Sequence, residues 1–208
     1  EPAFRALALT LPSESDIARE IGANIDPDAI FVARETLAKA IASANSDRFA
    51  DLYDSHDAGD FQPDATSAGK RALRNVLLEY ISLASIEPDH AAAQFANATN
   101  MTDKAAALTT LAHKSPGHVE ATSALTQFEE TYASDPLVMD KWFIIQATIP
   151  GAATLDLVRG LTAHPAFSLT NPNRVRSLVG TFASGNHTGF HRADGAGYRF
   201  LAETVIAL

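Results

Sequence analysis

The chain has 208 residues, of which 46% are hydrophobic, so it can bury a sizeable core in one large domain or two small ones. Its 25 acidic and 16 basic residues give a net charge of -9, which argues against nucleic acid as a partner. The absence of cysteine excludes disulfides, thiolate catalysis and cysteine-based zinc sites. No apolar run approaches the roughly 18 residues of a membrane span, so we expect no membrane partner. The absence of cysteine favours a cytoplasmic location.

Hydrophobic residues recur with helical spacing from end to end, and no segment alternates as a strand would, which predicts an all-α fold. Ser13 followed by Asp16 is typical of a capping box, here opening a short helix that ends at Gly22. Asp26 is expected to cap a longer helix over residues 27–46.

A polar segment over residues 55–66, which contains Gly59 and Pro63, is the expected long loop. A continuous apolar stripe with helical spacing follows it, formed by Leu73, Val76, Leu77, Tyr80, Ile81 and Ala84. Arg71 and Arg74 flank this stripe, and we expect both to be surface residues or to form ion pairs.

The remaining predicted helices cover residues 88–98, 102–113, 137–148, 152–163, 172–183 and 197–208. Thr102 is expected to cap the second of these. The third follows Asp135-Pro136, contains Trp142 and Phe143, and has hardly any polar face, so it belongs in an interior. The last stops at Leu208 without glycine, proline or a basic final turn, so we expect the polypeptide to continue.

Short loops between consecutive helices favour antiparallel neighbours. We therefore predict an α-α superhelix of stacked antiparallel helical hairpins, an ARM/HEAT-like solenoid, in preference to one closed bundle.

None of the seven histidines begins an HExxH motif, so a zincin core is absent from the sequence. His187, His191 and Asp194 are spaced so that they could bind one metal ion. Three glycines make that stretch loop-like, which favours surface or cap-forming histidines instead. Glu129 and Glu130 adjoin on an apparently solvated helix, and we expect no acid/base role for them.

The segment from Thr170 to Gly180 holds the best functional candidates, Arg174 and Arg176. Asn171 and Pro172 suit the start of a helix, but arginines in its first turns are disfavoured by the helix dipole. Helical geometry places the two arginines on opposite flanks of the buried face, so at most one of them lines a given groove. Two interpretations stay open, namely a salt bridge to a neighbouring helix and a contact with a peptide carboxylate or a partner domain.

Several strings resemble the C-terminal helical domain of bacterial aminopeptidase N, in that family's order and spacing. They are Phe61-Gln62-Pro63-Asp64, Arg71-Ala72-Leu73-Arg74-Asn75, Asn100-Met101-Thr102-Asp103, Asp140-Lys141-Trp142-Phe143, His164-Pro165-Ala166-Phe167, Asn171 to Leu178, Phe190-His191, Asp194-Gly195 and Gly197-Tyr198. The resemblance covers nearly the whole chain.

In that family zinc, the HExxH helix and the exopeptidase glutamates belong to an upstream thermolysin-like domain, which a small β-sandwich separates from the helical domain. The resemblance implies that residues 1–208 are a noncatalytic part of this helical domain, ending before the family's last helices. It implies no cofactor in this part and zinc in a parent metalloaminopeptidase of the gluzincin class.

The implied partners are the thermolysin-like and β-sandwich domains of the same polypeptide, together with peptide substrates. The implied role is to cap the active-site chamber and control substrate access. Arg176 resembles the arginine that faces the substrate chamber in this family, and Arg174 is a weaker candidate for the same channel.

Two other hypotheses come from different functional classes. One is a free-standing α-solenoid that binds protein partners on its concave face. The other is an independent hydrolase that uses His187, His191 and Asp194 with a bound metal ion.

Overall fold

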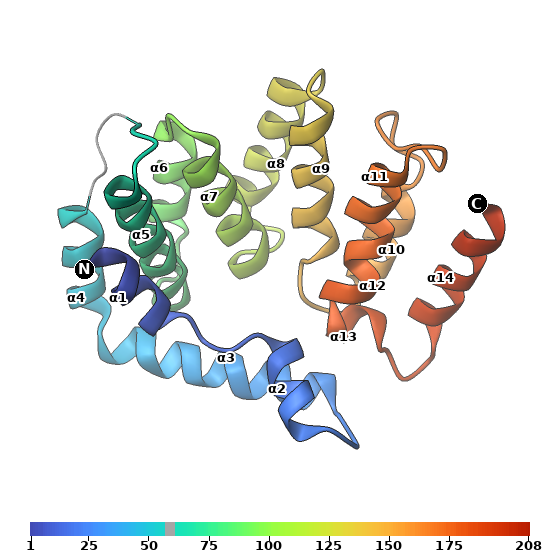
Figure 1. The fold of residues 1–208 in the computed structure, drawn as a ribbon, viewed down its shortest axis with the longest axis horizontal. Coiled ribbons are helices and arrows are strands. Elements are labelled where there is room, and N and C mark those ends of the chain that lie inside the picture. The colour runs from blue at the N-terminus through green and yellow to red at the C-terminus, as the bar shows by residue number, and fades with distance from the viewer. Residues whose placement is uncertain (57–60) are drawn as a thin grey trace. The chain divides into compact units, whose positions relative to one another are not determined.

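The computed structural model describes residues 1–56 and 61–208, and every regular element within these ranges is a helix (Figure 1). The predicted all-α class is therefore confirmed. Gly59 of the expected loop lies outside the described residues. Contacts divide the chain into one unit of Glu1–Ile25 and Ala29–Ala124 and a second unit of Asp26–Asp28 and Leu125–Leu208.

The earlier helices are α1 (Pro2–Leu9), α2 (Glu14–Ile21), α3 (Pro27–Ala44), α4 (Ser46–Ser55), α5 (Ala65–Ala84), α6 (Asp89–Asn97), α7 (Met101–Lys114) and α8 (Val119–Tyr132). The later elements are α9 (Pro136–Ala147), α10 (Thr154–Leu161), α11 (Pro172–Val175), the π-helical turn η1 (Arg176–Gly180), α12 (Thr181–Gly185), α13 (His187–Phe190) and α14 (Ala196–Ala207).

In the first unit, α5 packs against α1, α4, α6 and α7, and α6 also packs against α7 (Figure 1). The predicted apolar stripe of α5 supplies the centre of this core, because Leu73, Leu77 and Ile81 are buried. Val76 is half-buried and Ala84 is exposed, so not every residue of the predicted stripe belongs to the buried core.

Helix α1 was not predicted from the sequence, and it approaches α5 closely at Gly69. A Cβ atom at position 69 would lie 3.1 Å from Ala3 Cβ and 3.2 Å from the Ala3 backbone nitrogen. The close packing of the two helices therefore depends on a glycine. Helix α1 buries Ala6 and exposes Phe4 and Leu7, so it has no broad apolar stripe that the sequence could reveal.

The helix predicted over residues 27–46 is α3, which is continuous and ends two residues earlier than predicted. Helix α3 ends at Ala44, and the Asn45 side chain donates a 2.9 Å hydrogen bond to the carbonyl of Ile41 in its last turn. Helix α4 follows and was not predicted, since Phe49 and Tyr53 are its only buried side chains. Two apolar positions four residues apart make too short a pattern to identify a helix.

The caps decide where several helices begin. Ser13 accepts a hydrogen bond from the Asp16 backbone N–H, which confirms the predicted capping box of α2. The prediction for α7 was wrong by two residues. Its cap is Asn100, whose side chain accepts from the Asp103 N–H, so Thr102 lies inside the first turn.

In the second unit, α9 packs against α10, α11, η1 and α12. Asp135 caps α9 as the sequence indicated, accepting from two backbone N–H groups at 3.0 and 3.2 Å. Trp142 and Phe143 are 4% and 0% exposed, which confirms that α9 is an interior helix. Its exposed residues nevertheless include two apolar ones, Leu137 and Ile144, which are 71% and 40% exposed.

The glycine-containing segment after α12, expected to be a loop, forms the short helix α13. Asn186 caps it by accepting from the Gly189 backbone N–H at 2.9 Å. The same side chain donates to the carbonyl oxygens of Ala147 and Ile149, at 3.0 and 2.7 Å. The buried Asn186 amide thus fixes α13 to the end of α9.

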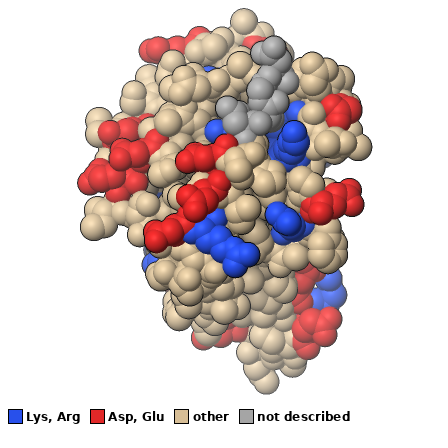
Figure 2. All heavy atoms as spheres, turned by 90° about the vertical axis from the view of Figure 1, so that its left-hand side faces the viewer, with Lys and Arg blue, Asp and Glu red and all other residues tan. Residues whose placement is uncertain are grey.

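Two surface properties follow from the described residues. No helix among them is both long enough and apolar enough to cross a membrane. The face shown in Figure 2 carries acidic and basic side chains next to one another, so its charges are mixed.

Candidate functional site

The helix that carries both candidate arginines begins as the sequence predicts. Asn171 accepts hydrogen bonds from the N–H groups of Asn173 and Arg174, and Pro172 occupies the first helical position. The following turn was not predicted, because residues from Arg176 to Gly180 are π-helical. Such turns are rare and occur frequently at functional sites.

Arg174 is buried, with 6% of its surface exposed. Its Nε donates to the carbonyl of Ala166 at 2.8 Å, and one terminal nitrogen donates to the carbonyl of Pro136, also at 2.8 Å. The same nitrogen forms an ion pair with Asp140. The guanidinium also lies 5.6 Å from the centre of the Phe143 ring. Arg174 therefore joins the start of α9 to α11 and to the loop before it.

Asp140 connects Arg174 to the π-helical turn, and we call Arg174, Asp140 and Ser177 together the Arg174 clamp. Besides the ion pair with Arg174, the Asp140 carboxylate accepts a 3.0 Å hydrogen bond from the Ser177 hydroxyl. The side chains of Arg174 and Asp140 are 7% and 18% exposed, so water screens this pair weakly. The residues on both sides of Arg176 are consequently held by one carboxylate.

Arg176 lies between these fixed residues and is exposed. Its side chain forms no hydrogen bond and no ion pair with any described residue. Its carbonyl accepts from the Thr181 hydroxyl at 3.1 Å, which is part of the turn. Of the two interpretations left open by the sequence, the salt bridge to a neighbouring helix describes Arg174, which lies in the interior, whereas Arg176 lies at the surface.

His164 is a polar residue of the same region that the sequence analysis did not single out. Its Nδ1 accepts a hydrogen bond from the Ala166 N–H at 3.1 Å, so this nitrogen carries no proton. Its Nε2 lies 2.8 Å from a carboxylate oxygen of Glu129 and is left as the donor. Glu129 was expected on a solvated face, and that interpretation is wrong because it is half-buried and bonded to His164.

Aromatic side chains pack around His164. The centres of the Trp142 and Phe143 rings lie 5.1 and 5.6 Å from the centre of its imidazole. The Trp142 indole N–H donates to the carbonyl of Leu125 at 3.0 Å. Together with the Arg174 clamp, these contacts bring together three of the strings on which the family resemblance rests.

A second polar network lies in the first unit. The Tyr53 hydroxyl donates to the Gln94 side chain at 2.8 Å, and Gln94 donates to Asn75 at 2.8 Å and to the Asp103 carbonyl at 3.0 Å. Asn75 in turn donates to the Asp103 carboxylate at 3.1 Å. This network ties α4, α5, α6 and α7 together, and burial raises the pKa of the Tyr53 phenol.

Arg71 and Arg74 were expected at the surface or in ion pairs, and for Arg71 this is wrong. Arg71 is 6% exposed, donates to the Gln62 carbonyl at 3.0 Å, and places its guanidinium 4.8 Å from the centre of the Phe61 ring. Arg74 is half-buried, with its guanidinium 4.4 Å from the centre of the Tyr53 ring. Both cations therefore pack on aromatic faces.

The three residues considered as metal ligands do not converge on one point. The imidazoles of His187 and His191 stack with their centres 5.9 Å apart, and His191 Nδ1 lies 2.6 Å from the Tyr198 hydroxyl. Asp194 pairs with Arg192 at 2.7 Å. Among residues 1–56 and 61–208, no group of three or more His, Cys, Asp or Glu side chains could hold a metal ion.

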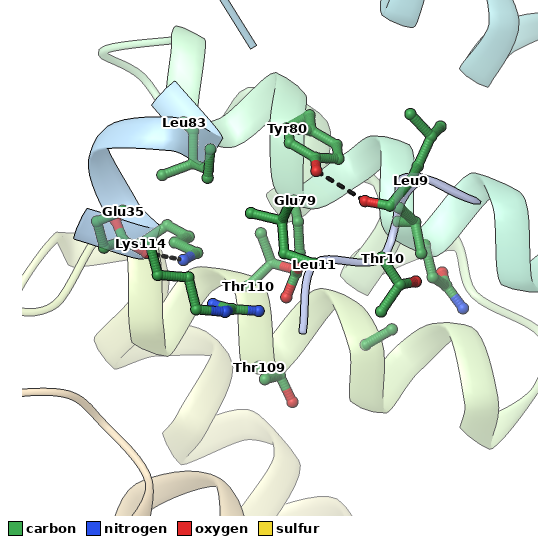
Figure 3. A pocket seen from close by; sticks show the side chains of 15 residues that line it. Leu9, Thr10, Leu11, Glu35, Glu79, Tyr80, Leu83, Thr109, Thr110 and Lys114 are labelled. Atoms are coloured by element: carbon green, nitrogen blue, oxygen red, sulfur yellow. Dashed lines mark hydrogen bonds and ion pairs between the residues drawn. The ribbon is translucent and has the colours of Figure 1, made fainter. Parts of the chain in front are cut away.

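A pocket of about 300 Å³ lies in the first unit, between the segment Leu9–Leu11 and helices α3, α5 and α7 (Figure 3). Glu35 and Lys114 form a 2.7 Å ion pair on one side of it. On the opposite side, the Tyr80 hydroxyl donates to the Leu9 carbonyl at 2.7 Å. This pocket was not predicted from the sequence, because its walls come from segments far apart in the chain.

Comparison with known proteins assigns the chain to a family. The family described as "Domain of unknown function (DUF3458_C) ARM repeats" matches residues 1–208. The chain belongs to the DUF3458_C family. The description of this family as ARM repeats also confirms the predicted ARM-like class of the fold.

Curated relatives of this DUF3458_C domain carry the name aminopeptidase N. It is 38% identical to that of Escherichia coli (strain K12) over 211 residues, and 42% identical to that of Caulobacter vibrioides over 210 residues. These matches cover 100% and 99% of this chain, and 24% of each relative. The expected resemblance to the C-terminal helical domain of bacterial aminopeptidase N is confirmed.

A solved structure shows the same fold. Aminopeptidase A of Legionella pneumophila, in complex with aspartic acid, superimposes with a TM-score of 0.86 at 30% identity. The match covers 97% of this chain and 25% of that one. The chain therefore spans about a quarter of the length of each of these proteins.

Proposed function

We propose that this domain is the noncatalytic helical part of a zinc-dependent aminopeptidase, and that it caps the active-site chamber and controls the entry of peptides. The observation that carries the proposal is the match of all 208 residues to the DUF3458_C family, with relatives named aminopeptidase N that are about four times as long. In this proposal the reaction takes place in the rest of the polypeptide.

The partners of the domain are then the thermolysin-like and β-sandwich domains of the same polypeptide, and zinc belongs to the former. We assign no described residue of this domain to zinc, because no three His, Cys, Asp or Glu side chains among them are placed to hold a metal ion. When bound, zinc would activate the water that attacks the peptide bond. The residues of this domain would bind and orient the peptide.

Arg176 is the residue to which we assign peptide contact. It is exposed and has no partner among the described residues, so its guanidinium is available to a carboxylate outside this domain. A guanidinium can bind a carboxylate through two parallel hydrogen bonds. The Arg174–Asp140–Ser177 clamp fixes the backbone around it, which lowers the entropy lost on binding.

Arg174 has a different role in this proposal. All of its contacts are with its own unit, and its side chain is 7% exposed. Arg174 orients the helix that carries Arg176. It therefore affects the proposed substrate channel only through the position of Arg176.

The first experiment tests Arg176→Ala in the full-length enzyme with two kinds of substrate. A lost charge-assisted hydrogen bond weakens binding by about 1.5–3 kcal/mol, so we expect kcat/KM for peptides to fall by roughly tenfold or more. Small chromogenic aminoacyl substrates, which lack a distant carboxylate, should lose much less. Arg48→Ala, an exposed arginine on α4, is the matched control. Equal losses for both substrate classes would contradict the channel role.

The second experiment tests where catalysis resides. The 208-residue chain, shown to be helical by circular dichroism, should not hydrolyse aminoacyl anilides when zinc is added. Turnover at the rate of the full-length enzyme would contradict the noncatalytic assignment.

A further inference from the structure

The pocket of the first unit has the size and the wall chemistry of a small-molecule site. Its volume of about 300 Å³ is at the lower end of the range of ligand pockets. The apolar part of its wall includes the half-buried side chains of Leu11, Val76 and Leu83. An occupant of this pocket is therefore small and has one apolar end.

One pair of charges in the wall is already satisfied. Glu35 and Lys114 lie 2.7 Å apart, and their side chains are only 17% and 13% exposed. They neutralise each other and close that side of the pocket (Figure 3).

Two further charged residues of the wall, Arg34 and Glu79, form no ion pair with any residue that the structure describes. The Nε of Arg34 donates to the Pro12 carbonyl at 2.9 Å, which orients the guanidinium, while its terminal nitrogens have no acceptor among the described residues. Glu79 is exposed and forms no hydrogen bond or ion pair with a described residue. Among the described residues, the pocket thus offers one positive and one negative group that no ion pair neutralises.

The charges of Arg34 and Glu79 both influence the hydroxyl group of Tyr80. Burial raises the pKa of its phenol, the charge of Glu79 raises it further, and the charge of Arg34 opposes both. Both charges are therefore within electrostatic range of one hydroxyl group on the pocket wall. Separated charges of opposite sign beside an apolar wall match a zwitterion with an apolar side chain.

We propose that this pocket binds a free α-amino acid with an apolar side chain. Its carboxylate pairs with the terminal nitrogens of Arg34, its ammonium group pairs with Glu79, and its side chain lies against Leu11, Val76 and Leu83. The site lies in the first unit and holds neither Arg176 nor a catalytic residue. It is a second small-molecule site, separate from the function proposed above.

The direct test uses L-leucine as the probe, with crystals of the full-length protein soaked in it. Density for leucine in the pocket, with its carboxylate at Arg34 and its ammonium group at Glu79, is the expected result. An empty pocket at saturating leucine would overturn the proposal, as would a pocket filled by another part of the polypeptide.

The solution test measures leucine binding to the full-length protein by calorimetry. Arg34→Gln and Glu79→Gln should each weaken binding at the pocket by about tenfold or more, because each removes a charge-assisted contact. Glu130→Gln, an exposed position on α8, is the control and should bind like the wild type. Leucine that binds elsewhere in the protein gives the same calorimetric signal in the wild type and in the three variants. Differences between these four proteins therefore report binding at the pocket.

Two analogues of leucine complete the experiment. 3-Methylbutylamine lacks the carboxylate and 4-methylpentanoate lacks the ammonium group, so both should bind the pocket more weakly than leucine. If either binds as tightly as leucine, or if both variants bind leucine like the wild type, the zwitterion site is refuted. Arg176→Ala should leave the effects of Arg34→Gln and Glu79→Gln on leucine binding at the pocket unchanged, so this proposal and the proposed function fail separately.

Discussion

Arg174 and Arg176 lie two residues apart on one helix, yet one is buried in an ion pair with Asp140 and the other is exposed without a partner among the described residues. The difference follows from helix geometry, since a step of two residues turns the side chain by about 200°. Two identical side chains thus have different surroundings, one buried and one exposed.

The first prediction concerns this separation. Arg174→Ala leaves the Asp140 carboxylate buried without its cation, so we expect the local free energy of unfolding to fall by about 3–5 kcal/mol. Arg176→Ala removes an exposed side chain and should change it by less than about 0.5 kcal/mol. Hydrogen exchange of the amides in α9, α11 and α12, measured in the full-length protein, reports both values. Similar effects of the two substitutions would contradict the assignment.

The second prediction concerns His164. In His164→Phe the ring contacts with Trp142 and Phe143 can persist, but the Ala166 N–H loses its acceptor and Glu129 loses its donor. We expect a loss of about 1–3 kcal/mol, the usual effect of leaving a polar group unsatisfied. Glu129→Gln is the control, because its amide oxygen can still accept from Nε2. Hydrogen exchange at Ala166 and Phe167 should increase in the first variant and stay close to the wild type in the second.

The sequence predicts much of the local structure of this domain. The caps at Ser13 and Asp135 and the apolar composition of α9 depend on neighbouring residues alone, and they are confirmed. Short helices are harder to predict, because α1 and α4 gain their stability from contacts with α5. The burial of α5 residues was visible in the spacing of Leu73, Leu77 and Ile81.

The candidate site was predicted only in part, for a related reason. The helix start at Asn171 follows from local pattern, whereas the burial of Arg174 does not. The partner of Arg174 is Asp140, 34 residues earlier, and no local pattern could choose it among the acidic residues. The partnership of His164 with Glu129, 35 residues earlier, and the pocket beside Tyr80 depend on tertiary packing in the same way.

The third prediction uses two glycines that differ in their surroundings. A Cβ at Gly197 would lie 2.1 Å from the Phe190 carbonyl oxygen, so Gly197→Ala must displace the start of α14. A Cβ at Gly160, within α10, would meet no atom within 4 Å. Gly160→Ala should therefore stabilise the helix by about 0.5–1 kcal/mol. Thermal unfolding should show a lower midpoint for the first variant and an equal or higher midpoint for the second.

The last prediction concerns pH and the stacked imidazoles of His187 and His191. Burial lowers the pKa of His191 below its usual 6.5, and the nearby His187 lowers it further. The folded state therefore binds fewer protons than the unfolded state between this lowered pKa and 6.5. The contribution of His191 to the free energy of unfolding is fully present above about pH 6.5. It is lost as the pH falls from 6.5 through the lowered pKa.

Hydrogen exchange over residues 187–200, corrected for the intrinsic effect of pH, should accordingly show less protection at pH 5.5 than at pH 7.5. The groups that face His191 are His187 and Tyr198, whose hydroxyl lies 2.6 Å from Nδ1. His191→Gln removes the titrating ring and should flatten the pH dependence of this segment, while α9 serves as an internal control. A dependence of the same size in wild type and His191→Gln would assign the effect to another group.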